Sequence, residues 1–522
     1  MYFPEEHQSE NTAFTPQILS PEARQIGLSP FYELHTAQLI DRVRAPKLSD
    51  FIPPYPPRLT KRPSPWRRVM LARRNFLAMW EEDTFALDFS TLPVFMRQTF
   101  LCNSPDSVQF AFSLKNASFE RKAPQMRYAL EPLLGDGLFI SDGETWRKRR
   151  RMVAPIVHVS RLAKFAPIMV EAAQEVEDRW RKSEGAIVDV LIESATLTAE
   201  IICRTLFGRK LGHDYARQIV DGFSEYQRVI GQTDLISLLG LPDWVPRWQG
   251  RAIRKSVKSI HRVLGQVIEN YRTQSSLEDT SVIGQLLNAR DENGVPLDEE
   301  ALRNEIAVLF MAGHETTANS LTWLWYMLSQ APDVEAKLHA ELDSVLGGRP
   351  PTLADVPKLI YTRAIFDETL RLYPPVPILP REAMRQEYYR NMRIPKGSLV
   401  FVVPWLLHRH KKLWDKPDHF IPERFLPENS GSISKFAYIP FSIGPRICAG
   451  MSFGLTEAIL CLATLAQKFK LRLKPGYIVN PVCRLTLRPE GGMPMTIVAR
   501  TEFGAAIASP ASVPTGCPVH QG

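Results

Sequence analysis

The feature that constrains this fold most is a long apolar helix predicted between Asp298 and Pro332. Asp298 is a preferred N-terminal cap and Pro332 ends a helix, which leaves roughly 33 residues, or about 50 Å of helix. Its middle, residues 306–313, is apolar on all sides, which is typical of a helix through the interior of a protein. The polar run that follows, residues 314–317, therefore needs a chemical or structural reason, because burying charge is costly.

The composition is that of a globular protein. The chain has 522 residues, of which 44% are hydrophobic and 23% charged, with a net charge of +8. These values exclude fibrous and disordered proteins. Helical periodicity dominates from Trp66 onward, and β-branched runs occur late, at residues 398–403 and 495–499. We therefore predict a mainly α fold with small β-sheets, preceded by an extension over residues 1–45 and followed by a tail over residues 501–522.

The surroundings in which the chain works can also be predicted. Its six cysteines lie far apart without a C-x-x-C pair, which suits a reducing compartment. We recognise no signal peptide and no run of about 18 apolar residues, and expect a cytoplasmic protein without a transmembrane anchor. Basic residues are interleaved with acidic ones, so we expect no nucleic-acid partner; an acidic protein partner suits the charge better.

The strongest local pattern is Phe441–Gly450, which reads F-S-I-G-P-R-I-C-A-G and precedes an apolar helix expected to reach about Phe469. Cys448 would face the free N–H groups of that helix, which favour a thiolate and suit a metal ligand. Gly444 allows a tight turn, and the next loop glycine lets the helix start pass close to a flat cofactor. Arg446 offers donors for a carboxylate. Taken alone, the pattern leaves an inert buried cysteine as an equal alternative.

The spacing F-x-x-G-x-R-x-C-x-G resembles the haem-ligand loop of the cytochrome P-450 monooxygenases. Five fixed residues at this spacing should occur by chance in roughly one such chain in 10⁴. The resemblance implies one domain over residues 46–500, with haem b between the long central helix and the cysteine loop. It also implies that Cys448 is the axial ligand of the haem iron. The remaining cofactor-binding residues of the loop would be Phe441, Gly444, Arg446 and Gly450.

The polar run of the long helix matches a second segment of the same family. Residues 312–317, A-G-H-E-T-T, resemble the family's oxygen-activating segment. The resemblance implies that Thr316 holds the outer oxygen or a water, that Glu315 is the acid of a proton relay, and that Gly313 leaves room for a ligand. The alternative is an ordinary helix in which the threonines hydrogen-bond backbone carbonyls. His314 has no zinc-binding partner pattern, and we assign it no metal.

Two charged residues three positions apart carry a third match. Glu368 and Arg371 face the same side of a helix, where a surface ion pair is the ordinary interpretation. The resemblance implies instead that they join Arg424, in the sequence P-E-R-F, in a structural triad that fixes the region of the cysteine loop.

A basic run, residues 146–151, carries a fourth match. The resemblance implies that Trp146, Arg150 and also Arg381 reach the haem propionates. Five consecutive bases surround a helix rather than forming one stripe, which argues against a nucleic-acid site. We expect the remaining bases to face solvent near the cysteine side of the haem, where an acidic electron donor could dock.

The expected function is that of a haem-thiolate monooxygenase. The resemblance places substrate recognition in residues 103–142, 205–250 and 376–379, which are rich in apolar groups and indicate a terpenoid, steroid-like compound or fatty acid. Dioxygen and a separate ferredoxin or flavodoxin with its reductase would complete the reaction. Two alternatives stay open. One is a peroxide-driven or isomerising relative, which often lacks the acid and alcohol pair; the other is a non-catalytic haem-binding sensor.

Overall fold

A computed structural model of the chain describes residues 51–94, 97–208, 222, 225, 226, 251–274, 281–483 and 485–500. The predicted extension, the predicted tail and most of the expected substrate segment 205–250 lie outside the described residues.

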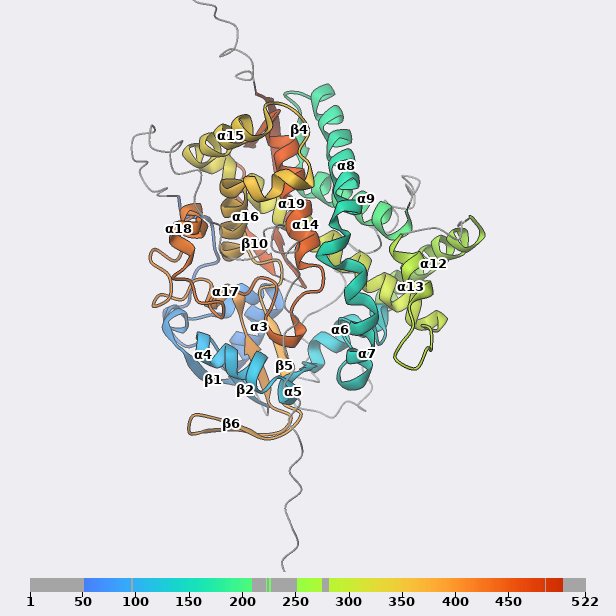
Figure 1. The fold of residues 1–522 in the computed structure, drawn as a ribbon. Coiled ribbons are helices and arrows are strands. Elements are labelled where there is room, and N and C mark those ends of the chain that lie inside the picture. Colours follow the sequence, from blue (N-terminus) through green and yellow to red (C-terminus); the bar gives the residue numbers. More distant parts are fainter. Residues whose placement is uncertain are drawn as a thin grey trace, which may run out of the picture. The chain divides into compact units, whose positions relative to one another are not determined.

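The described part of the chain is mainly helical with small sheets, as the sequence predicts (Figure 1). The α-helices are α3 (Pro65–Arg74), α4 (Pro105–Gln109), α5 (Asn116–Phe119), α6 (Pro124–Leu134), α7 (Gly143–Val153), α8 (Leu162–Lys182), α9 (Val190–Phe207), α12 (Arg251–Gln274), α13 (Val282–Asn288), α14 (Glu299–Gln330), α15 (Pro332–Leu346), α16 (Ile360–Leu372), α17 (Pro404–Leu407), α18 (Pro427–Ser430) and α19 (Met451–Ala466). The strands are β1 (Phe89–Val94), β2 (Arg97–Cys102), β3 (Arg121–Lys122), β4 (Ile187–Asp189), β5 (Leu379–Glu382), β6 (Glu387–Tyr389), β7 (Met392–Ile394), β8 (Leu399–Val402), β9 (Phe469–Leu473), β10 (Pro481–Cys483), β11 (Leu487–Pro489) and β12 (Pro494–Ala499).

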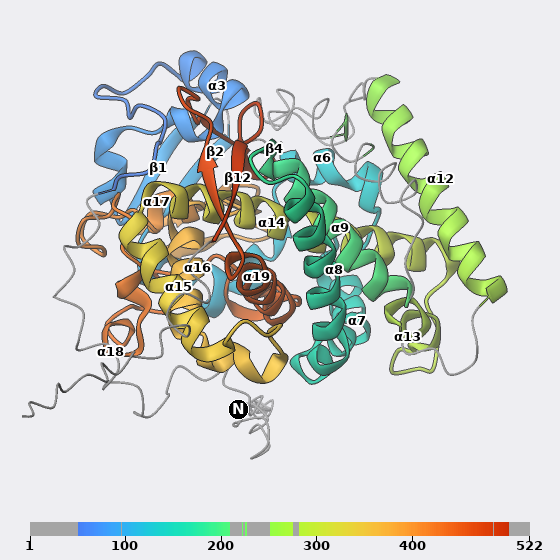
Figure 2. The same cartoon turned by 90° about the horizontal axis from the view of Figure 1, so that it is seen from above.

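The long central helix is present as predicted. It is α14, with 32 residues. The side chain of Asp298 caps it by accepting a hydrogen bond from the Ala301 N–H over 2.7 Å. Its apolar middle packs against α9, so α14 runs through the interior, beneath the neighbouring helices seen from above in Figure 2.

The largest sheet has the strand order β1-β2-β8-β5-β3. Only the β2–β8 pair in it is parallel; the other pairs are antiparallel. The apolar run Leu399–Val402 forms β8, the middle strand of this sheet. An apolar sequence suits this position because three of the four residues of β8 are buried. The short strand β3 pairs with β5 at the edge, in a register that places Lys122 opposite Arg381. This register brings two cations from distant parts of the chain together.

The apolar helix after the cysteine loop, α19, is shorter than predicted. It ends at Ala466, because Phe469 already begins β9, which pairs with β12. One face of α19 packs on α8.

By length and composition alone, the helical stretch Gly143–Lys182 could cross a membrane, although the sequence showed us no such apolar run. It is not one straight helix, since 3₁₀ turns at Ala154–Val157 and Val159–Arg161 divide α7 from α8. The buried core helix of a soluble protein passes the same test.

Candidate functional site

The cysteine loop turns back on itself before α19. The Cys448 N–H donates to the carbonyl oxygen of Phe441 over 2.9 Å. Cys448 is accessible to solvent, and the protein atoms around it still partly desolvate the thiol, which raises its pKa. The N–H of Gly450 and the guanidinium of Arg150 act in the opposite direction and lower that pKa. A nearby cation and a helix N-terminus favour the thiolate, which is the form that binds a metal.

The two glycines of the loop have different surroundings. Gly444 has φ +76, and a Cβ there would lie 1.9 Å from the carbonyl oxygen of Phe112. Only glycine fits, so the loop is seated on the π-helical turn Phe110–Leu114. At Gly450, by contrast, a Cβ would meet no described atom within 4 Å. That open space beside the helix start suits the close approach of a flat cofactor.

Three cations, of which Lys122 and Arg381 are buried and Arg446 is half-buried, lie close enough to repel one another near this loop. Burial, with a smaller effect from the charge of Arg446, lowers the pKa of Arg381 to about 9. Burial also lowers the pKa of Arg446 to about 10 and that of Lys122 well below its usual value, the latter helped by both arginines. In the described part of the chain, no carboxylate is among the charges that act on Lys122 or Arg381. Glu120 and Asp142 act on Arg446, so the need for an anion lies at Lys122 and Arg381, and the propionates of a haem fit it.

The basic run on α7 differs in part from the prediction. Trp146 is buried, and the Arg446 guanidinium lies 4.6 Å from the centre of its ring. Arg149 was expected to face solvent, and this is wrong: it is buried, because Asp136 and Glu305 cover it with ion pairs of 3.1 Å and 3.5 Å. The other ion pairs of the run are Arg147–Glu120, Arg147–Glu144, Lys148–Asp291 and Arg151–Glu292.

Arg150 has a different environment from the other bases of this run. No carboxylate of the described residues is among the causes of its shifted pKa, which burial lowers and Cys448 raises. Arg150 is therefore the base of this run whose charge acts on the Cys448 thiol.

Four residues on one face of the middle of α14 are not fully buried. Ala312 is exposed, and Leu309, Gly313 and Thr316 are half-buried. These positions share one helix face because they are separated by three or four residues. The Thr316 hydroxyl donates to the Ala312 carbonyl oxygen over 2.7 Å. A threonine in this arrangement can exchange its carbonyl acceptor for a guest molecule on the same face.

Glu315 is held from outside the helix. The hydroxyl of Thr486, in the turn between β10 and β11, donates to its carboxylate. The same hydroxyl accepts a hydrogen bond of 3.2 Å from the Asn319 amide, one helical turn along α14. The position of the Glu315 carboxylate is therefore set by Thr486 in this turn. The sequence analysis did not predict this contact.

Gly313 and His314 both pack against neighbouring side chains. A Cβ at Gly313 would lie 2.8 Å from the Cδ1 of Ile202 on α9. Glycine here therefore allows α14 and α9 to approach closely, whereas we expected it to leave room for a ligand. His314 is buried and stacks on Phe310 at 5.6 Å, and burial lowers its pKa to about 4. A neutral imidazole in apolar surroundings follows.

The structure brings the predicted triad together. Glu368 and Arg371 on α16 are both fully buried and form two hydrogen bonds of 2.6 Å and 2.8 Å. Arg424 approaches the same carboxylate to 3.5 Å. Arg371 also donates to the backbone carbonyl oxygens of His408, Pro417 and His419. The Arg371 side chain thus holds the backbone of residues 408–419, which precede the cysteine loop.

Two buried ionisable residues near the site were missed by the sequence reasoning. Lys122 joins the cation cluster only through the pairing of β3 with β5, for which the sequence carries no local pattern. Glu457 lies fully buried on α19, where burial raises its pKa to about 8. A single carboxylate in an otherwise apolar helix is a pattern that could have pointed to Glu457.

The mainly α fold, in which the helix after the cysteine loop, α19, packs against the long central helix α14, is that of the haem-thiolate monooxygenases. The model of the family described as Cytochrome P450 matches residues 73–493, and the chain belongs to this family. Membership makes it a monooxygenase with a haem cofactor, which uses dioxygen, a small-molecule substrate and electron-transfer partners.

Relatives come from bacteria and animals. The chain is 33% identical to cyclooctatin synthase from Streptomyces melanosporofaciens over 75% of this chain and 84% of that protein. It is 34% identical to cytochrome P450 4V2 from Rattus norvegicus over 72% of this chain and 75% of that protein. The solved haem domain of cytochrome P450DA superposes with a TM-score of 0.71 and 26% identity, over 87% of this chain and 99% of that one.

Proposed function

We propose that the protein inserts one oxygen atom of O₂ into a C–H bond of an apolar small molecule, with haem b bound through Cys448. The observation that carries the proposal is the solvent-accessible Cys448 in the loop before α19, with Arg150 close enough for its charge to act on the thiol. When bound, the haem supplies the activation of dioxygen. A pocket lined by apolar side chains supports the substrate class, and so do the names of two bacterial relatives, cyclooctatin synthase and pentalenene oxygenase.

Residues from four elements would hold the cofactor. Cys448 supplies the thiolate, and the cations of Arg150, Arg381 and Arg446 would bind the propionates. Lys122, which the sequence reasoning missed, would add a fourth cation. Phe441, Gly444 and Gly450 shape the loop that presents the sulfur, and Trp146 fixes the Arg446 guanidinium. The triad of Glu368, Arg371 and Arg424 keeps the backbone behind this loop in place.

The proton-handling residues lie on α14. The Thr316 hydroxyl can turn from the Ala312 carbonyl to a guest oxygen or water and hold a proton there. Glu315 would supply protons from its carboxyl group, which the Thr486 hydroxyl keeps in place. This acid and alcohol pair favours dioxygen as the oxidant over peroxide. Gly313 contributes by letting α14 lie close to α9.

The electrons would come from a ferredoxin or flavodoxin with its reductase, in the cytoplasm. The exposed ends of Arg147, Lys148 and Arg151 form a basic surface on α7 that would steer an acidic donor. Each of these bases already has an acidic partner within the chain, so docking would exchange one partner for another.

Spectra and turnover together test this function. The purified holoprotein should show the thiolate-type reduced carbon monoxide spectrum, and Cys448→Ser should abolish that spectrum. Turnover of apolar compounds should require a ferredoxin system and O₂. Thr316→Ala should keep electron consumption while product falls, because the hydroxyl that holds the proton is gone. Turnover that peroxide supports and that the ferredoxin system with O₂ does not support would refute the use of O₂.

A further inference from the structure

Helix α3 presents both apolar and basic side chains to solvent on one face. Trp66 is 61% exposed and Met70 is 37% exposed, although large apolar side chains are usually buried. These two residues are four positions apart, so they form one apolar strip along the helix. Arg67 and Arg74, seven positions apart, follow one flank of the strip, and Arg73 lies at its C-terminal end. All three arginines are exposed.

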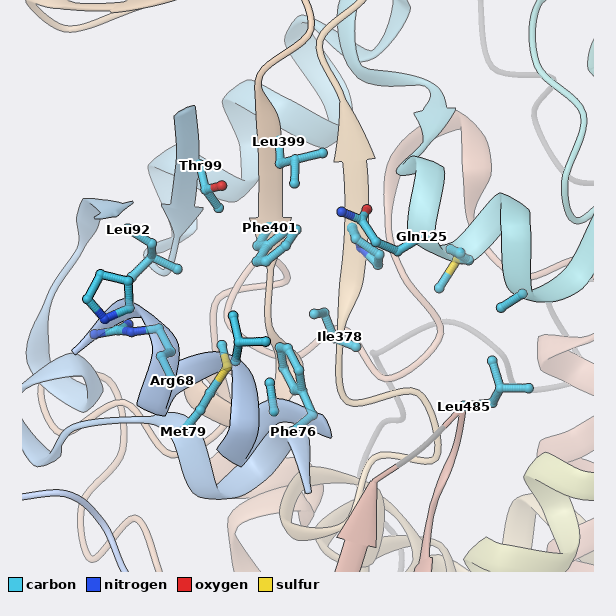
Figure 3. Close-up of a pocket in the computed structure, with 16 residues that line it drawn as sticks. Arg68, Phe76, Met79, Leu92, Thr99, Gln125, Ile378, Leu399, Phe401 and Leu485 are labelled. Atoms are coloured by element: carbon cyan, nitrogen blue, oxygen red, sulfur yellow. The ribbon is translucent and has the colours of Figure 1, made fainter. Parts of the chain in front are cut away.

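The opposite face of α3 is turned toward the protein. Arg68 and Val69 are buried, and Arg68 forms an ion pair of 2.5 Å with Glu81. Both residues, together with Ala72, line the apolar pocket, which Figure 3 shows with Arg68 labelled. The helix α3 therefore forms a wall whose inner side meets the pocket and whose outer side meets solvent.

The exposed cations on and just before α3 have no acidic partner in the described part of the chain. Residues 51–80 contain seven Lys or Arg residues and no Asp or Glu. Two of the seven, Arg58 and Arg68, form ion pairs with more distant carboxylates. The other five are exposed and form no ion pair with a described residue; they are Lys61, Arg62, Arg67, Arg73 and Arg74. This surface therefore carries five positive charges that an external anion can reach.

An anionic membrane surface fits this combination of side chains. Tryptophan is favoured at the interface between lipid and water, and arginine and lysine stems can cover apolar surface while their charged ends contact phosphates. A helix with an apolar strip and flanking cations lies in the plane of such an interface. With ten residues α3 is too short to cross a membrane, which takes about 20 residues, so the contact would be peripheral.

We infer that α3 docks the protein onto an anionic membrane surface, with Trp66 and Met70 among the lipid headgroups and the five cations on the lipid phosphates. This inference goes beyond the proposed function and does not depend on it. Apolar compounds partition into membranes, and the inner side of α3 lines the apolar pocket. Under the proposed function, docking would therefore bring this pocket close to a supply of substrate.

The test measures how much of the haem-loaded, full-length protein sediments with lipid vesicles. Vesicles of phosphatidylcholine and phosphatidylglycerol should bind the protein, and vesicles of phosphatidylcholine alone should bind it much more weakly. The variant Arg73→Gln, Arg74→Gln should lose about fivefold in affinity for each charge removed at low salt, which corresponds to about 1 kcal/mol. Trp66→Ser should lose about tenfold at low and at high salt, because salt does not screen an apolar contact.

Two matched controls separate α3 from the rest of the basic surface. The variant Lys164→Gln, Lys182→Gln removes two exposed cations from α8, and Ile192→Ser removes an apolar side chain of α9 that is 62% exposed. Both controls should bind vesicles as the parent protein does.

The inference would be overturned if the parent protein did not sediment with the phosphatidylglycerol vesicles, or if the controls lost as much affinity as the α3 variants. A ferredoxin that binds through Arg73 and Arg74, in a protein that ignores vesicles, would also overturn it and assign this surface to the electron donor. The thiolate-type spectrum is recorded on the same samples. Its absence from a parent protein that binds vesicles through α3 would overturn the proposed function and leave this inference standing.

Discussion

Removing Arg371 should destabilise the protein more than any single surface change. Its guanidinium is fully buried, pairs with Glu368 through two hydrogen bonds and holds three backbone carbonyl oxygens, two of them at 2.7 Å. Arg371→Leu leaves the Glu368 carboxylate in the interior with Arg424 at 3.5 Å as its nearest cation. Breaking a buried pair in this way costs about 3–5 kcal/mol. The unpaired carbonyls place the expected loss at the upper end of that range.

The assay is urea unfolding of the holoprotein, followed by tryptophan fluorescence. The control is Arg181→Leu, which breaks an exposed ion pair with Glu177 on α8 and should cost at most about 1 kcal/mol. The double variant Glu368→Leu, Arg371→Leu removes the stranded carboxylate as well and should be more stable than Arg371→Leu alone. If the double variant is the less stable of the two, the stranded carboxylate is not the cause of the loss and the reasoning is refuted.

Three further predictions concern the loop and the buried ionisable groups. Gly444→Ala should cost several kcal/mol and loosen haem binding, because its Cβ would clash with the Phe112 carbonyl; Gly431→Ala, whose Cβ has open space, should not. Glu457 has a folded-state pKa of about 8 against an ordinary 4.5, so stability should fall by roughly 1.4 kcal/mol per pH unit between those values, and Glu457→Gln should flatten that slope in urea unfolding. Lys122→Met should stabilise the haem-free protein but speed haem transfer to apomyoglobin; slower transfer would contradict the cation cluster.

The parts of the fold that the sequence predicted correctly depend on local patterns. The ends of α14 follow from Asp298 and Pro332, which act within one turn of the helix. The end of α19 does not follow from its own residues, because the chain leaves the helix to pair β9 with β12 near residue 499. An apolar helix and an apolar strand in succession have no visible boundary until the partner strand is known.

The site residues that could be predicted from the sequence likewise depend on local patterns, and those that could not depend on contacts between distant parts of the chain. The cysteine loop could be predicted because its glycine, arginine and cysteine lie within ten consecutive residues. The burial of Arg149 could not, since Asp136 and Glu305 approach it from a loop and a helix at distant positions. The role of Lys122 could not be predicted either, because it depends on the register of β3 against β5. A shift of one residue in this register would place the Lys122 side chain on the other face of the sheet.

The turn between β10 and β11 connects one wall of the apolar pocket to the carboxylate of Glu315. The Leu487 N–H donates to the carbonyl oxygen of Pro375 over 2.9 Å, and the Leu487 carbonyl accepts from the Trp323 indole on α14 at 3.2 Å. The turn is therefore fixed to α14 and to the segment before β5. Because Leu485 lines the pocket and Thr486 holds Glu315, one anchored backbone sets both this wall of the pocket and the place of the carboxylate. Under the proposed function, a substrate that displaces this wall must also displace the carboxylate, so the shape of the pocket and the supply of protons would be selected together.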